Sequence, residues 1–283
     1  MAHKNTPTLI DLIIVFFQSI LRIGHSKHAD KDDKKTYKKY IYSWSTYRAY
    51  VKHCKYFLKY CRKHYKCKTI EECRQYVDEW LTLRAKTLSA YTVKLEASAL
   101  AKLYQCSTKD FVKTPARQRK DITRSRGEAE RDKHFSEENH MELVSFCRSV
   151  GLRRHELANL RGTDLVKDGD CYYVHVLKGK GGRSRYVKVI GDVQNVIALM
   201  TTAGEGKVFE KIPGAADIHG YRREYAQAYY GMVARPLYIL PKDQKYSCRK
   251  EKYGIVYDRN AMLEVSRSLG HNRISVIAGH YLD

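Results

Sequence analysis

The sequence predicts a multidomain protein in which an all-α helical bundle is followed by a mixed α+β domain. Apolar residues recur at helical spacing up to about residue 110, and β-branched and aromatic runs flank a glycine-rich turn after residue 170. A basic stretch without hydrophobic periodicity separates the two regions. We therefore expect an N-terminal helix and linker over 1–35, a helical domain over 36–110, a basic linker over 111–134 and a second domain over 135–283.

The composition limits the classes of function. A hydrophobic content of 43% is enough to bury cores, which excludes wholesale disorder. A formal net charge of +22 predicts a polyanion as partner, either nucleic acid or an acidic membrane. Eight scattered cysteines without a CxxC pair, and no secretory signal, favour a reducing compartment.

The first apolar segment spans 8–23. Asp11 and Gln18 interrupt it, and it is short of the ~20 residues that a bilayer requires. Its polar residues fall near one helical face, which predicts an amphipathic helix. Packing on its own chain is the favoured role, docking on a partner protomer comes second, and membrane contact comes third.

Capping residues and periodicity predict three helices in the bundle. Ser45 or Thr46 caps the first, Thr69 and Glu72 form a capping box for the second, which runs through Leu81, and Ser89 opens the third. Opposite the apolar face of the first helix lies a stripe of five cations without an intervening carboxylate. We call it the basic stripe and expect it to contact DNA phosphates; its members are Arg48, Lys52, Lys55, Lys59 and Arg62.

The second domain mixes helices and strands. Ser136 is expected to cap a helix that Gly151 ends, and a further helix follows over 153–160. Strands are expected over 171–177 and 183–190, joined by a hairpin turn. Further helices are expected over 193–200, 218–230 and 259–268.

Metal chemistry is not expected. The crowded His53, Cys54, Cys61, His64 and Cys67 match no usual zinc spacing, so free thiols in a helix core are favoured. Asp168, Asp170 and Lys178 raise the idea of a metal-dependent nuclease. A turn before a strand is the simpler interpretation of Asp168 and Gly169, and no second carboxylate is placed for a metal.

An ordered series of residues in the second domain resembles the tyrosine recombinase (phage integrase) family of mobile elements. The family's set is an Arg, a Lys on a hairpin, His-x-x-Arg, a His and a nucleophilic Tyr. The matching positions, in chain order, are Arg153, Lys180, His219, Arg222, His271 and Tyr281. The resemblance covers about residues 36–283, and it implies a core-binding domain with a SAM-like helical bundle followed by a catalytic domain.

The resemblance implies a role for each of these residues. Arg153 and Arg222 would hold the phosphate oxygens, and Tyr281 would attack phosphorus to form a 3′-phosphotyrosine. His219 would accept the phenol proton, Lys180 would protonate the leaving 5′-oxygen, and His271 would hydrogen-bond the phosphate. Because the phosphoester energy is kept in the covalent bond, no cofactor and no ATP are expected.

The sequence departs from the family pattern in two places, and each departure predicts a structural difference. The long stretch between Arg222 and His271 predicts an inserted hairpin. The sequence also ends two residues after Tyr281, where many relatives continue into a helix that docks on a neighbouring protomer, so either packing between protomers comes from elsewhere or the sequence is shortened at this end.

The expected function is site-specific DNA recombination or integration. A type IB topoisomerase-like enzyme and a non-cleaving DNA-binding accessory protein are the alternatives. The implied partners are double-stranded DNA, three further copies in a tetramer and an accessory bending or directionality factor, with no membrane. The expected location is cytoplasmic, in association with the nucleoid.

Overall fold

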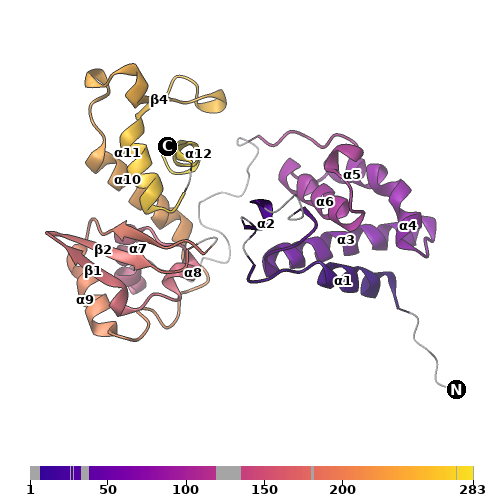
Figure 1. Cartoon of the computed structure of the whole chain (residues 1–283), viewed down its shortest axis with the longest axis horizontal. Coiled ribbons are helices and arrows are strands. Elements are labelled where there is room, and N and C mark those ends of the chain that lie inside the picture. Colours follow the sequence, from indigo (N-terminus) through magenta and orange to yellow (C-terminus); the bar gives the residue numbers. More distant parts are fainter. Residues whose placement is uncertain are drawn as a thin grey trace. The chain divides into compact units, whose positions relative to one another are not determined.

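In the computed structural model the chain forms two compact units, Met1–Thr123 and Arg124–Asp283 (Figure 1). The structure describes residues 7–25, 27, 29–32, 38–118, 135–179, 182–271 and 273–282. Most of the expected basic linker, 119–134, lies outside the described residues. The first residue of that predicted linker, Phe111, is buried in the core of the N-terminal unit.

The N-terminal unit is helical in its described part. Its helices are α1 (Leu9–Ser19), α2 (Ala29–Asp32), α3 (Trp44–Tyr65), α4 (Ile70–Cys73), α5 (Val77–Ala85) and α6 (Ala90–Leu103). The long helix α3 packs against α6 and α1, and fully buried side chains such as Phe57 and Leu100 fill the space between them. The described helices here and in the second unit include none that is long and apolar enough to cross a membrane.

Helix caps fix where these helices begin. The side chain of Ser43, rather than Ser45 or Thr46, caps α3 by accepting a hydrogen bond from the Thr46 amide. Thr69 caps only the short α4, after which a 3₁₀ turn leads into α5, so the expected second helix is broken in two. Ser89 caps α6 as predicted.

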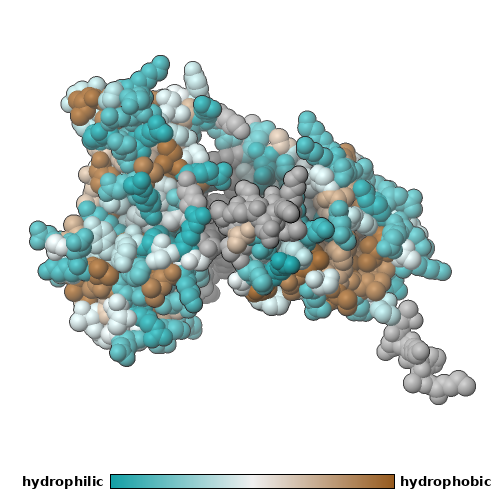
Figure 2. All heavy atoms as spheres, in the orientation of Figure 1, coloured by the Kyte–Doolittle hydropathy of each residue, from teal (hydrophilic) through white to brown (hydrophobic). Residues whose placement is uncertain are grey.

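Helix α1 belongs to the core of the N-terminal unit. Thr8 and Asp11 form its capping box, and Ile13 and Phe17 are fully buried between α1 and the rest of the unit. This confirms the favoured prediction that the segment packs on its own chain. Figure 2 shows apolar side chains gathered on the surface of this unit, and Leu12 and Val15 are exposed members of α1.

The C-terminal unit combines a small sheet with helices. The sheet is an antiparallel meander of β1 (Leu165–Asp168), β2 (Cys171–Val176) and β3 (Arg185–Lys188), in which Val174 pairs with Val187. Strand β1 was not predicted: Asp168 ends it, and Gly169 at φ +55° turns the chain into β2. The helices are α7 (Met141–Val150), α8 (Arg154–Leu157), α9 (Val193–Ala203), α10 (Ile218–Val233), α11 (Arg259–Ser268) and α12 (Ile274–His280).

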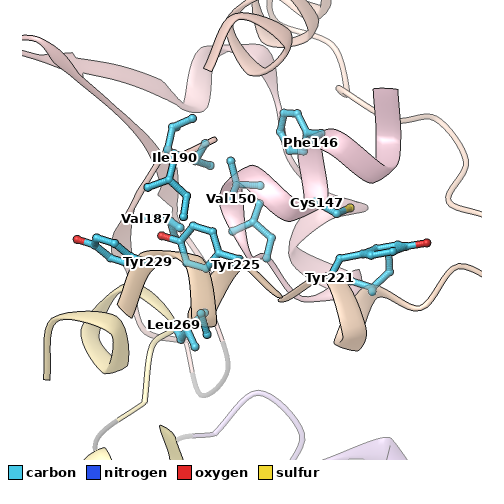
Figure 3. Packing of buried hydrophobic residues seen from close by; sticks show 14 of the residues in the cluster. Phe146, Cys147, Val150, Val187, Ile190, Tyr221, Tyr225, Tyr229 and Leu269 are labelled. Atoms are coloured by element: carbon cyan, nitrogen blue, oxygen red, sulfur yellow. The ribbon is translucent and has the colours of Figure 1, made fainter. Parts of the chain in front are cut away.

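Helices α7 and α10 form the centre of this unit (Figure 3). Phe146 and Val150 of α7 meet Tyr221 and Tyr225 of α10 in a buried cluster. Gly151, which ends α7 with φ +54°, must be glycine, because a Cβ there would lie 2.3 Å from the Tyr225 ring. The backbone at the end of α7 therefore lies directly against α10.

An inserted hairpin joins α10 to α11, as the length of this stretch predicts. Its strands β4 (Lys245–Ser247) and β5 (Val256–Asp258) pair antiparallel. Helix α12 follows α11 and was not predicted. Its sequence, ISVIAGH, holds β-branched residues and a glycine, which have low helix propensity.

Candidate active site

Arg222 lies at the centre of the candidate site. It points from α10 into the protein, is only 1% exposed, and donates three hydrogen bonds. Nη1 and Nη2 donate to the carbonyl oxygens of Gly151 and Leu269, and Nε donates to the Tyr281 hydroxyl over 3.2 Å. Burial lowers the pKa of this guanidinium, and contact with Tyr281 opposes that shift. The side chain is thus held in one orientation before any ligand binds.

Tyr281 directly follows α12 as its C-cap, and it is half-buried against two other predicted site residues. Its hydroxyl lies 3.2 Å from Nε2 of His271, and the two ring centroids are 5.4 Å apart. The Arg222 guanidinium lies 5.7 Å from the centroid of the phenol ring. The structure therefore brings Arg222, His271 and Tyr281 of one chain together around a single oxygen atom.

Arg153 lies next to this group at the N-terminus of α8. Its Nη2 donates to the carbonyl oxygen of Leu269 over 3.1 Å, the same oxygen that accepts a hydrogen bond from Arg222. Two guanidiniums thus converge on one backbone atom, and their mutual repulsion favours an anion nearby. Arginine's planar fork suits the non-bridging oxygens of a phosphate.

Glu156 fixes the position of Arg153 and also binds a further arginine, Arg185. Its carboxylate accepts hydrogen bonds from the Arg153 amide and guanidinium at 2.8 Å each, and from both terminal nitrogens of Arg185 at 2.9 and 2.7 Å. Burial alone would raise the pKa of Glu156, but Arg185, supported by Arg153, lowers it to about 2. The carboxylate therefore stays charged and orients both arginines.

Arg185 was missed by the sequence analysis. It comes from β3, donates from Nε to the carbonyl oxygen of Ser268 over 2.8 Å, and has a side chain only 9% exposed. The alternation of side chains along a strand could have indicated it, because Arg185 lies two residues before the buried Val187 and so shares its inward face. Arg153 and Arg185 share the Glu156 carboxylate, and with Arg222 they give this region three cations.

The two remaining predicted site residues are His219 and Lys180. His219 is exposed in the first turn of α10, three residues before Arg222 and so on the same side of the helix. Lys180 lies outside the described residues. On either side of it, the Gly179 amide donates a hydrogen bond to the carbonyl oxygen of Arg183.

The basic stripe lies along α3 in the N-terminal unit. Arg48, Lys52, Lys59 and Arg62 are exposed and Lys55 is half-buried. Within the described residues no carboxylate forms an ion pair with any of the five, although Asp11 is close enough to Lys55 for its charge to be felt. Among the described residues the stripe is therefore a positive surface without ion-pair partners.

The histidine and cysteine side chains that were considered as zinc ligands lie in the helical core of the N-terminal unit or at its surface. Nδ1 of His53 lies 3.1 Å from the fully buried Glu96, which Arg84 also contacts. Cys54, Cys61 and Cys67 are buried free thiols. Across the part of the chain that the structure describes, no group of three or more His, Cys, Asp or Glu side chains is placed to hold a metal ion.

Comparison with known proteins gives similarity in structure alone. No protein-family profile and no curated protein sequence matches the chain. The XerH site-specific recombinase bound to palindromic difH substrate, in a post-cleavage complex, aligns over 100% of this chain and 87% of its own, with 14% identity and a TM-score of 0.52. Its pre-cleavage complex aligns over 81% and 75%, with 15% identity and a TM-score of 0.45. The Tn1549 transposon integrase with transposon right-end DNA aligns over 82% and 95%, with 14% identity and a TM-score of 0.38.

The first of these alignments spans both units, and the arginines, histidine and tyrosine described above lie in the unit that the sequence analysis assigned to catalysis. From the alignment along its whole length, the chain has the fold of the tyrosine recombinases.

Proposed function

We propose that the chain is a site-specific DNA recombinase that cleaves and rejoins strands through a 3′-phosphotyrosine at Tyr281. One observation carries the proposal: the Tyr281 hydroxyl lies 3.2 Å from both Arg222 Nε and His271 Nε2, beside a second arginine that shares a carbonyl oxygen with the first. A phenol, a proton acceptor and two phosphate-binding cations are the groups that phosphoryl transfer to tyrosine requires.

The reaction balances without an outside reactant. The phenol oxygen attacks phosphorus as its proton passes to a histidine, the bond from phosphorus to the 5′-oxygen breaks, and Lys180 protonates the leaving oxygen. Arg153 and Arg222 stabilise the charge on the non-bridging oxygens. Reversal by another strand's 5′-hydroxyl rejoins the DNA, so the bond energy is conserved.

Two histidines are candidates for the proton acceptor. The resemblance to the family assigned this role to His219 and gave His271 the phosphate. The contact between His271 Nε2 and the Tyr281 hydroxyl favours His271 as the first acceptor. His219, on the same side of α10 as Arg222, would then complete the phosphate-binding group.

The remaining expectations fit the same proposal. The N-terminal unit would act as the core-binding domain, with the basic stripe against the phosphates of double-stranded DNA. Recombination between two sites requires four protomers, so we expect a tetramer on DNA, assisted by a bending or directionality factor. The protein would be found with cellular DNA.

Trapping the covalent intermediate tests the proposal. Singly nicked duplexes tiled across the DNA that flanks the gene let the short strand diffuse away after cleavage, so an SDS-resistant adduct accumulates in EDTA. Tyr281→Phe should bind DNA and form no adduct. Tyr238→Phe, which changes a phenol that is 87% exposed, is the matched control and should behave as wild type.

Variants of the other site residues refine the assignment. Arg222→Ala should slow adduct formation by about 30- to 1000-fold, since it loses a charge-assisted contact worth ~2–4 kcal/mol. His271→Gln should slow it more than His219→Gln does. Adduct formation by Tyr281→Phe, or a strict need for Mg²⁺, would refute the proposal. Adduct without recombination between two sites would favour the topoisomerase-like alternative.

A further inference from the structure

The inserted hairpin contacts the segment that carries Tyr281. Nζ of Lys252 donates to the carbonyl oxygen of Ala278 over 2.7 Å and also to the carbonyl oxygen of Leu282. The Tyr257 hydroxyl donates to the same Leu282 oxygen over 3.2 Å. Two side chains of the insert thus bind backbone oxygens on both sides of Tyr281.

The base of the insert is rigidly attached to the C-terminal unit. Arg235, at its start, forms a two-point ion pair with the fully buried Asp258, with N–O distances of 2.8 and 2.9 Å. Asp258 also caps α11 by accepting hydrogen bonds from the amides of Asn260 and Ala261. The pKa of Asp258 is lowered, first by its hydrogen bond from Arg235, so this anchor stays charged. Lys252 therefore projects from a fixed support.

The segment that Lys252 contacts needs external support. Helix α12 has seven residues, which is too short to be stable by itself. Its last carbonyl oxygens have no partner within the helix, and a cation placed there also interacts favourably with the helix dipole. Burial of Ile277 and Leu282 holds the apolar side of the segment, while the ammonium group holds its backbone.

We propose that the insert is a clamp in which Lys252 is a positioning residue for Tyr281. This inference rests on the proposed function. The clamp keeps the phenol next to Arg222 and His271 of the same chain, so that Tyr281 acts in the site of its own protomer. A misplacement of 1 Å can cost about 100-fold in rate, so loss of the clamp should slow cleavage without weakening DNA binding.

Single-turnover adduct formation at saturating nicked DNA measures this effect. Lys252→Met keeps the aliphatic stem and removes the ammonium, and it should slow the reaction by about 10- to 100-fold, with the Kd for DNA within twofold of wild type. Lys252→Arg should restore most of the rate. Lys242→Met, an exposed lysine on the same insert, is the matched control and should have no effect.

Hydrogen exchange separates the clamp from the chemistry. The amides of Tyr281 and Leu282 both donate to the carbonyl oxygen of Ile277. We expect Lys252→Met and Tyr257→Phe to speed exchange at these two amides, while exchange in α7 stays unchanged and shows that the unit remains folded. Unchanged exchange at 281 and 282 overturns the clamp, as does a wild-type cleavage rate in Lys252→Met. A wild-type chain that forms no adduct while exchange responds as expected refutes the proposed function and leaves the clamp standing.

Discussion

Glu156 is the carboxylate on which the arrangement of the arginines depends, and its replacement by glutamine measures that dependence. The substitution keeps the shape of the side chain and removes its charge. Arg153 and Arg185 would then lose their charged partner in a region where the Glu156 side chain is only 1% exposed. Removing one partner of a buried ion pair typically costs about 3–5 kcal/mol.

The pKa of Glu156 gives a second, independent value for the free energy by which the ionised carboxylate stabilises the folded state. A fall from the ordinary 4.5 to about 2 corresponds to about 3 kcal/mol in favour of the ionised folded state. Because the pKa is lowered on folding, this stabilisation is fully present above pH 4.5 and is lost as the pH falls toward 2. Glu156→Gln should therefore unfold about 3 kcal/mol more easily at pH 7, and the difference from wild type should shrink steadily below pH 4.5.

Spectroscopy can separate the two units in this measurement. Both tryptophans, Trp44 and Trp80, lie in the N-terminal unit, so tryptophan fluorescence during urea unfolding reports that unit alone. Near-UV circular dichroism of the tyrosines follows the C-terminal unit as well. Glu156→Gln should move the tyrosine transition and leave the tryptophan transition in place.

A matched control sets the scale for the Glu156 result. Glu224→Gln breaks an ion pair with Arg148 whose side chains are both 43% exposed, and it should cost less than about 1 kcal/mol. If the two variants lose equal stability at pH 7, or if the loss in Glu156→Gln does not depend on pH, the buried carboxylate does not hold the site as we argue.

Two predictions concern the N-terminal unit. Replacing Lys52 and Lys59 by alanine should weaken DNA binding equally for all sequences and lower the slope of log affinity against log salt by about 1 per lost contact. Replacing the exposed Lys86 and Lys94 by alanine is the control and should leave the slope unchanged. An unaltered slope in the first variant would mean that the basic stripe is only solvated. Phe17→Ala should cost about 3–5 kcal/mol in the tryptophan-detected transition, because the ring is fully buried. Val15→Ala, on the exposed side of the same helix, should cost less than about 0.5 kcal/mol, and similar losses in both variants would place α1 outside the core.

Local patterns were sufficient for the elements whose ends are fixed by nearby side chains. Ser89 caps α6, and Gly151 ends α7 in a left-handed conformation, as their residue types indicate. Helix α12 lacked such a signal, because its β-branched residues and glycine have low helix propensity. It is stabilised instead by burial of Ile277 and by the contact from Lys252, which the local sequence does not show. Strand β1 was missed for a similar reason, since its four residues become a strand only by pairing with β2.

In the candidate site, too, the identity of the residues could be predicted from the sequence and their positions in space could not. The types and order of Arg153, Arg222, His271 and Tyr281 were indicated by the resemblance to the tyrosine recombinase family, which rests on residue types that the sequence shows directly. Their positions depend on the carbonyl oxygens of Gly151 and Leu269, and every residue has such an oxygen, so no residue type marks them. Three guanidiniums can be held close together only where backbone oxygens and one carboxylate absorb their hydrogen bonds. The last residue of α11 and the residue after it provide two of these oxygens, from Ser268 and Leu269, and the chain then leads to His271. One short segment thus supplies carbonyl oxygens to the arginines and also leads to His271, which explains why residues far apart in the sequence meet at the Tyr281 hydroxyl.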